Sequence, residues 1–205
     1  MSSIAVYYAI IYGVIIISAA IICYLVSYVF KQSKGTKDMQ DISNAIKEGA
    51  SAFLKRQYKT IAWIAVIALV IICIASYFGR TAEGKSSADA ISFAVHTGIA
   101  FITGAFCSAL SGFIGMFMSV NSNIRSADGA KHGLNRALQI AFKGGAVTGL
   151  CVTTLSLLGV TTLFVIYGGG FNGGTEAVQN APSLIVGFGF GASLVALFAQ
   201  LGGGI

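Results

Sequence analysis

The sequence predicts an all-α integral membrane protein, a polytopic bundle of transmembrane helices in one membrane domain over residues 1–205. Hydrophobic residues make up 56% of the chain and charged residues 10%, with a mean hydropathy of +0.82. Soluble domains average about 25% charged residues. The apolar residues also fall into five runs, each near or above the roughly 20 residues that cross a hydrocarbon core. The predicted spans are residues 4–30, 61–78, 91–120, 144–167 and 182–205.

The first span, residues 4–30, contains no charged residue. A signal peptide would have a basic start and a shorter apolar core, so we expect this span to be retained. Residues 37–60 carry apolar side chains at helical spacing, including Met39, Ile42 and Ile46, with basic side chains on other faces. This pattern predicts an amphipathic helix that continues into the second span.

The third span, residues 91–120, follows a polar turn in which Ser86 and Asp89 have the spacing of a capping box. His96 lies near the start of this span, where we expect a hydrated interfacial histidine in preference to a member of a proton relay. Small residues recur at every fourth position of the span, which lets the backbone of another helix approach closely. These predicted helix-packing residues are Gly104, Ser108 and Gly112.

Residues 121–143 form a basic, polar connector, and we expect Arg125, Lys131 and Arg136 within it to lie near lipid headgroups. Glycines four residues apart predict further packing faces in the last two spans. These pairs are Gly145 with Gly149, and Gly187 with Gly191. The fifth span is expected to begin at Pro182, because proline suits the first turn of a helix.

The distribution of Lys and Arg predicts the orientation of the chain. The connection after the first span holds seven of these residues, the next two, the third four and the last none. Since basic loops stay on the cytoplasmic side, residues 31–60 and 121–143 should be cytoplasmic and the N-terminus outside. The net charge of +6 is thereby explained without a nucleic-acid partner.

No catalytic, substrate-binding or metal-ligating motif is evident in the sequence. The chain lacks a phosphate-binding glycine loop of the Walker type and an arrangement of Ser, His and Asp for nucleophilic catalysis. The four cysteines stand singly in four different spans, which favours a packing role over zinc binding or disulfides. Packing faces on three spans predict the front portion of a larger polytopic protein.

Three segments together resemble the membrane-bound, ion-translocating inorganic pyrophosphatases. They are KEGASAFLKRQYKTI (47–61), SNIRSADGAKHGLNRALQIAFKGGAVTGL (122–150) and LFAQLGGGI (197–205). The resemblance implies the first five helices of a homodimeric fold of about sixteen helices. It also implies an enzyme that couples hydrolysis of pyrophosphate at the cytoplasmic side to transport of H+, the default expectation, or Na+ across the lipid bilayer.

The resemblance implies Mg2+ as a cofactor and raises K+ as a second one. In the family, the residues that bind magnesium pyrophosphate begin after the Gly-Gly-Gly-Ile element, so this chain alone should be inactive. One departure concerns Gln200, where the family commonly has Arg in the region of the ion gate. Gln200 is therefore the one ion-gate candidate in the chain.

Two alternatives stay open from the residues themselves. One is a structural or regulatory membrane protein of five spans, whose packing faces bind a partner. The other is part of a secondary transporter or channel, because glycine-interrupted spans also occur in such folds.

Overall fold

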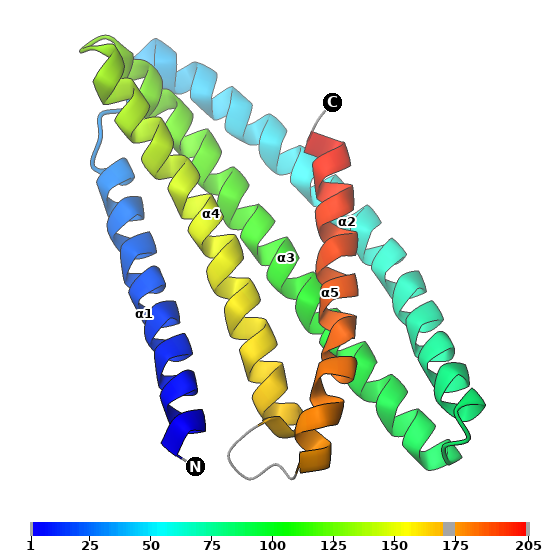
Figure 1. Ribbon diagram of the computed structural model, residues 1–205. Helices are drawn as coiled ribbons and strands as arrows, with labels where there is room; N and C mark the ends of the chain where they lie inside the picture. The colour runs from blue at the N-terminus through cyan, green and yellow to red at the C-terminus, as the bar shows by residue number, and fades with distance from the viewer. Residues whose placement is uncertain (1, 170–174, 204–205) are drawn as a thin grey trace. The chain divides into compact units, whose positions relative to one another are not determined.

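The computed structural model describes residues 2–169 and 175–203, and these residues are helical apart from short connections (Figure 1). Helices suit a membrane-spanning chain because they bond the backbone polar groups internally where no water is available. The elements in order are α1 (Ser2–Phe30), α2 (Lys37–Ala82), α3 (Ser87–Ala130), α4 (Leu134–Phe164), a π-helical turn η1 (Val165–Gly169) and α5 (Thr175–Gly203).

Five helices are long and apolar enough to cross a membrane, which confirms the predicted number of spans. The chain is thus an integral, multi-pass membrane protein. The prediction that residues 37–60 continue into the second span is also confirmed, because α2 is one helix of 46 residues. At about 1.5 Å per residue, α2 is roughly twice as long as the hydrocarbon core is thick, so part of it extends beyond the hydrocarbon.

The structure differs from the sequence prediction at the connector, residues 121–143. Helix α3 continues to Ala130 and α4 begins at Leu134, so most of the connector is helical. The turn between them contains Gly133, whose φ of 124° lies in the left-handed region that suits glycine. The polar residues of the connector therefore lie on helices and not in an irregular loop.

The predicted start of the fifth span at Pro182 is wrong for the helix. Helix α5 begins at Thr175 and Pro182 lies inside it, within the apolar stretch Asn180–Gln200. Proline removes only one helical hydrogen bond, and a helix held by its neighbours can continue through it. The last two residues of the predicted span, 204–205, lie outside the described residues.

Half of the expected capping box is present at the start of α3, because Ser86 caps the helix but the Asp89 carboxylate bonds to the Ser86 hydroxyl and not to its backbone N–H. The backbone N–H of Asp89 donates to Ser86 Oγ at 3.2 Å, and Ser86 Oγ donates to the Asp89 carboxylate at 2.7 Å. These bonds satisfy a free N–H at the beginning of α3 and place a negative charge at the positive end of its dipole.

The chain divides into two compact units. Unit 1 comprises Met1–Tyr12, Tyr58–Ala109 and Leu155–Ile205, and unit 2 comprises Gly13–Gln57 and Leu110–Thr154. The core of unit 1 contains Ala100, Leu163 and Phe188 from α3, α4 and α5. The core of unit 2 contains Val29, Met118, Val147 and Cys151 from α1, α3 and α4.

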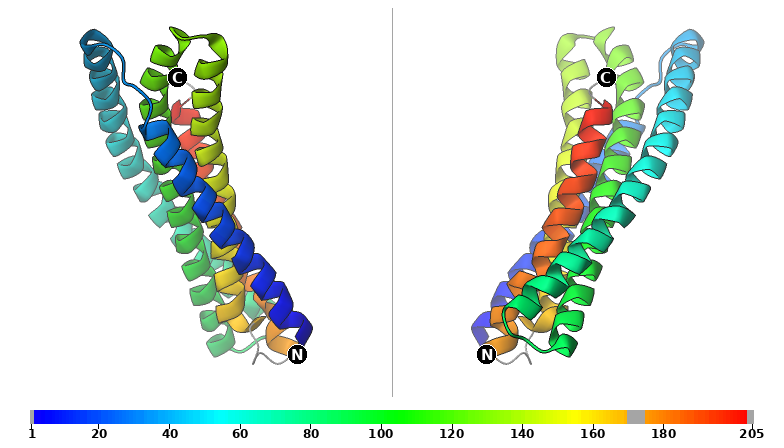
Figure 2. Two further views of the ribbon diagram at one scale, coloured as in Figure 1. Left: turned by 90° about the vertical axis from the view of Figure 1, so that its left-hand side faces the viewer. Right: turned by 90° about the vertical axis from the view of Figure 1, so that its right-hand side faces the viewer.

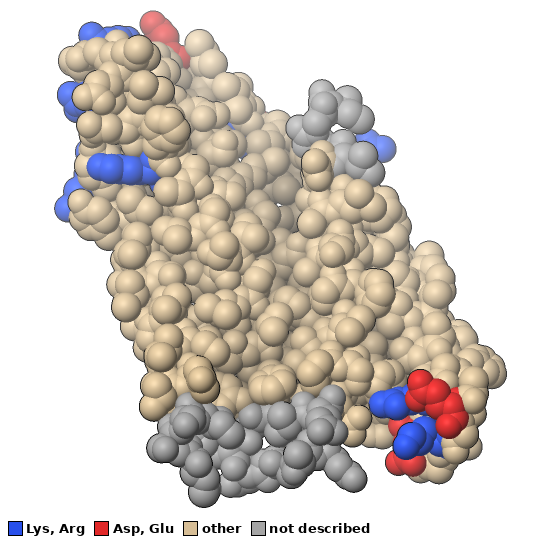
Figure 3. All heavy atoms as spheres, viewed as in Figure 1, with Lys and Arg blue, Asp and Glu red and all other residues tan. Residues whose placement is uncertain are grey.

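Charged side chains gather at particular places in each unit (Figure 3). In unit 2, Lys and Arg side chains collect over the end that contains the α3–α4 turn. In unit 1, residues of both signs meet at the α2–α3 turn, where Arg80 pairs with Glu83 at 3.0 Å and its guanidinium stacks on Phe93 at 4.1 Å. The surfaces near the middle of the apolar spans carry few charges, as contact with lipid requires.

Candidate functional site

In unit 1, α3 and α5 lie side by side (Figures 1 and 2) and approach closely at three glycines. A Cβ atom at Gly104 would overlap the carbonyl oxygen of Phe188, and a Cβ at Gly191 would overlap that of Phe101. A Cβ at Gly187 would overlap the carbonyl oxygen of Thr97. We call these three glycines the α3–α5 seam. Backbones that approach this closely gain dispersion contacts that larger side chains would prevent.

The other predicted helix-packing residues lie elsewhere. Ser108 is half-buried, whereas Gly112 is exposed on α3. At Gly145 and Gly149 a Cβ atom would meet nothing within 4 Å. The structure does not bring Gly145 or Gly149 against a described helix, so the packing role of these two glycines and of Gly112 stays a prediction.

His96 lies beside the end of α4. Its Nδ1 is 2.6 Å from the carbonyl oxygen of Ser92, and because a carbonyl only accepts, Nδ1 carries the proton. The Tyr167 hydroxyl donates to the His96 carbonyl oxygen at 2.8 Å, and the two rings meet edge to face at 5.0 Å. These contacts hold α3 to η1, where Gly168 has a φ of 107°.

A hollow of about 340 Å³ lies next to His96 at the α2–α3 turn. Its lining includes Arg80, Lys85 and Asp89 together with Asn180 of α5. The hollow therefore has polar and charged walls, and the position of His96 at a hydrated membrane interface stays a prediction.

Arg125 is the largest fully buried side chain in unit 2, with 1% of its surface exposed. Its Nη1 donates to the carbonyl oxygen of Asn121 at 2.6 Å, and its guanidinium lies 4.7 Å from the centre of the Phe30 ring. Its Nε has no hydrogen-bond partner. Protein side chains therefore cover Arg125 and keep it from direct contact with lipid headgroups, while its position near headgroup depth stays a prediction.

Asp128 follows one turn later, at the end of α3 that extends past the predicted span. It is buried and lies 3.3 Å from Lys131 Nζ. A hydrogen bond from Ser33 lowers the pKa of the Asp128 carboxyl, with a further contribution from Lys131. Ser33 belongs to the α1–α2 connection, so this carboxylate joins that connection to α3.

Gln200 is exposed near the end of α5. Among the described residues, no group of three or more His, Cys, Asp or Glu side chains could hold a metal ion. That this chain alone is inactive stays a prediction.

Comparison with known proteins assigns the chain to a family. The family model described as inorganic H+ pyrophosphatase matches residues 16–205. The chain belongs to this family. It is similar to the K+-insensitive pyrophosphate-energized proton pump of Caldanaerobacter subterraneus subsp. tengcongensis, with 67% identity over 199 residues, which are 97% of the chain and 28% of that relative.

Two further inorganic H+ pyrophosphatase relatives are more distant. The K+-insensitive pyrophosphate-energized proton pump 2 of Moorella thermoacetica is 52% identical over 93% of the chain and 25% of its own length. The pyrophosphate-energized membrane proton pump 3 of Arabidopsis thaliana is 38% identical over 95% of the chain and 25% of its own length. The chain spans about a quarter of the length of the curated relatives it matches.

Sequence reasoning missed two sets of residues in this family member. Gly144 and Gly159 pack closely, against Ser122 and the Phe188 ring respectively, although neither belongs to a predicted glycine pair. The buried polar residues of α3 were also missed, although Asn121, Arg125 and Asp128 recur at helical spacing and so share one face.

Proposed function

We propose that this chain contributes its five spans to a longer, membrane-bound pump that hydrolyses pyrophosphate and moves H+ across the membrane. The observation that carries the proposal is the 67% identity, over 97% of the chain, to a pyrophosphate-energized proton pump. The family match favours this function over a structural five-span protein or part of a secondary transporter. H+ is preferred to Na+ because the relatives named above are proton pumps.

Within such a pump, the role of the described helices is to position α5. The α3–α5 seam fixes the height of α5 relative to α3, because a shift along the helix would drive Cα atoms into carbonyl groups. Residues that follow α5 in a longer protein are then held at one level of the membrane. The predicted orientation, with the N-terminus outside and residues 31–60 and 121–143 cytoplasmic, would place the end of α5 at the cytoplasmic side.

Three further properties belong to the same proposal. Mg2+ is the cofactor that the family resemblance implies, but the described residues provide no site for it and no step through it is assigned to them. K+ should not be required, because the relatives from Caldanaerobacter and Moorella are called K+-insensitive. The family resemblance also supports a homodimer.

The test is a chimera in which this chain replaces the matching 199 residues of the Caldanaerobacter pump. In inverted vesicles, pyrophosphate added outside with Mg2+ should release phosphate and acidify the lumen, with and without K+. A pH-sensitive dye and a phosphate assay measure the two processes. Because the inverted vesicle exposes the cytoplasmic face, acidification also supports the proposed orientation.

Two controls make this test decisive. The unmodified Caldanaerobacter pump shows that the vesicles are tight and inverted, and a proton ionophore should abolish acidification while hydrolysis continues. A chimera that reaches the membrane in normal amount and neither hydrolyses pyrophosphate nor acidifies the lumen would count against the proposed function.

A further inference from the structure

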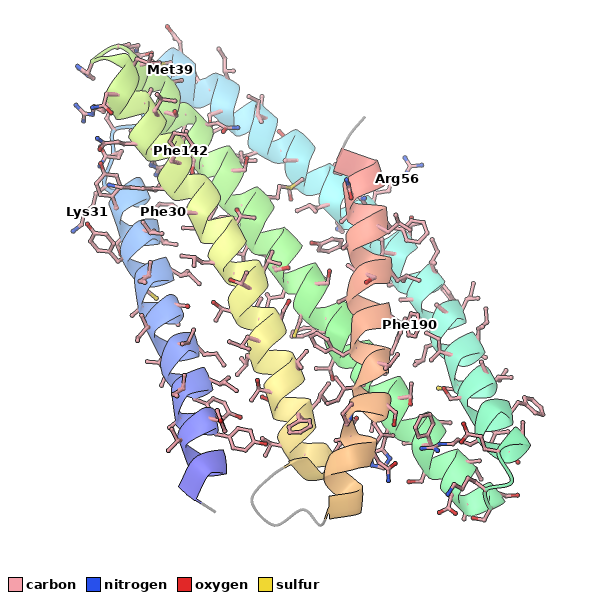
Figure 4. All side chains as sticks on the ribbon, viewed as in Figure 1. Phe30, Lys31, Met39, Arg56, Phe142 and Phe190 are labelled. Atoms are coloured by element: carbon pink, nitrogen blue, oxygen red, sulfur yellow. The ribbon has the colours of Figure 1, made fainter. Side chains whose placement is uncertain are left out.

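A positively charged face lies where the end of α1 meets α4 in unit 2. Tyr24, Tyr28 and Lys31 are four and three residues apart, so they share one face of α1. The backbone N–H of Lys31 donates to the carbonyl oxygen of Ser27 at 3.1 Å, which continues the helical geometry as far as Lys31. Figure 4 shows Lys31 at this end of α1. We call Tyr24, Tyr28 and Lys31, together with Lys143 of α4, the α1–α4 basic face.

Lys143 is held against α1 by an aromatic ring. Its Nζ lies 3.2 Å from the centre of the Tyr28 ring, which is a cation–π contact between the two helices. Val29, the next residue of α1, belongs to the core of unit 2 together with Val147, which lies one turn after Lys143. The position of the Lys143 ammonium group is therefore set by contacts of both helices.

The positive charge of the α1–α4 basic face is not balanced by acidic residues. Neither α1 nor α4 contains an Asp or a Glu. In the described part of the chain, Lys31 and Lys143 take part in no ion pair. Cations without a counter-charge at the edge of a low-dielectric region attract an anion more strongly than they would in water.

The depth of the α1–α4 basic face favours a phospholipid as that anion. Lys31 directly follows the predicted span 4–30. Lys143 directly precedes the predicted span 144–167, so both lysines are expected at the level of lipid headgroups. Tyr24 lies further into the span and is 65% exposed. A free phosphate ion gains nothing from this exposed ring, whereas a phospholipid can lay its acyl chains against it.

We propose that the α1–α4 basic face binds one anionic phospholipid, whose phosphate group pairs with Lys31 and Lys143 and whose acyl chains lie over Tyr24. A zwitterionic phospholipid carries its own cationic group, which the two lysines would repel, so the face should select a net negative charge. The inference goes beyond the proposed function, because it requires only that the chain lies in a membrane and not that it pumps.

Position-specific photocrosslinking in the chimera tests this site. The photoreactive residue p-benzoylphenylalanine is placed at Tyr24, and the chimera is reconstituted in phosphatidylcholine vesicles. A trace of either phosphatidylglycerol or phosphatidylcholine carries a fluorescent acyl chain, and fluorescence on the protein after illumination measures the crosslink. We expect at least about fivefold more crosslink with the phosphatidylglycerol probe, because each lysine near the headgroups attracts an anionic lipid.

The same photoreactive residue at Cys23 is the matched control for general attraction of anionic lipid. Cys23 is exposed, lies at nearly the same depth as Tyr24 and points about 140° around α1 from Tyr28. An equal preference at Tyr24 and Cys23 would mean that no particular site exists, and the proposal would fail. Crosslinks from Tyr24 to another part of the protein in place of lipid would show that the longer pump covers this face, and they would overturn the proposal too.

The charge is tested by changing Lys143 while the photoreactive residue is at Tyr24. Lys143→Gln should lower the preference for phosphatidylglycerol to about twofold or less. Lys143→Arg should preserve the preference, because arginine also carries a positive charge and stacks on an aromatic ring. Lys55→Gln removes an exposed cation from α2, outside the face, and should have little effect. An undiminished preference in Lys143→Gln would exclude the proposed pairing.

Competition separates a lipid site from a site for free phosphate. Inorganic phosphate is added to one sample, and chloride at the same ionic strength is added to another. Equal crosslinking of the phosphatidylglycerol probe in the two samples supports the lipid site. A loss that occurs only with phosphate would assign the face to the free ion and overturn the proposal.

Pyrophosphate-driven acidification is measured in the same vesicles. A chimera that pumps without selecting phosphatidylglycerol at Tyr24 overturns the lipid site and leaves the proposed function intact. A chimera that selects this lipid without pumping supports the lipid site and counts against the proposed function.

Discussion

Gln200 is exposed near the end of α5, at the position where the family resemblance commonly places an arginine. A positive charge within a membrane helix is costly and changes the protonation of neighbouring carboxylates. In the proposed pump, we predict that Gln200 gives the ion path a different local field from that of relatives with arginine. The role of Gln200 in the ion gate stays a prediction.

We expect Gln200→Arg in the chimera to lower the ratio of H+ moved to pyrophosphate hydrolysed by at least about twofold, because an added charge at this depth acts on the ion path. Parallel dye and phosphate assays give the ratio. Gln200→Leu is the control, since it removes hydrogen bonding without adding charge. Equal ratios in the wild type, Gln200→Arg and Gln200→Leu would show that position 200 has no gate role.

Helices α3 and α5 can pack this closely at the α3–α5 seam only because glycine has no side chain. A Cβ at Gly191 would overlap the Phe101 carbonyl oxygen and lie 2.9 Å from the backbone nitrogen of Ala105. Backbone atoms cannot move aside as a flexible side chain can. The two helices would have to separate, which reduces contact along their whole length.

Gly191→Ala should therefore lower the unfolding free energy of the purified chain by about 1–3 kcal/mol, as overpacking does. Gly145→Ala is the matched control, because a Cβ there meets nothing within 4 Å and alanine favours a helix by about 0.5–1 kcal/mol. Titration with a denaturing detergent, followed by circular dichroism, measures both variants. Equal stability of the two variants would contradict the seam.

Hydropathy predicted the number of membrane-spanning helices, but it did not predict which polar residues those helices bury. Apolar runs identify spans because the bilayer imposes a minimum length, and five spans were predicted correctly. Polar residues after position 120 were interpreted as a connector because exposure was assumed for them. Asn121, Arg125 and Asp128 are buried on α3, and burial of polar groups depends on partners that hydropathy does not include.

The glycine pairs show the same limit at the level of packing. Spacing predicts which small residues share a face of a helix, and it does so equally for Gly187 with Gly191 and for Gly145 with Gly149. Whether another helix faces that surface depends on the tertiary arrangement. Only the first pair lies against α3 in the structure.

At the scale of the whole molecule, the described residues show helix packing and no cluster of His, Cys, Asp or Glu side chains that could hold a metal ion. Pyrophosphate carries several negative charges, and its hydrolysis in this family is expected to need Mg2+ held by several carboxylates. The sequence has 7 acidic residues in total. In the described part of the chain, no three of them gather with each other or with His or Cys into a metal site.

The purified 205-residue chain in lipid vesicles should accordingly release phosphate from magnesium pyrophosphate no faster than empty vesicles do. The chimera under the same conditions serves as the positive control, and a phosphate assay over a range of protein concentrations provides the measurement. Because a soluble contaminant would also release phosphate, Gly191→Ala is included, which should not change a contaminant's rate. Release that increases with the chain and falls in Gly191→Ala would show that these helices hold a complete catalytic centre.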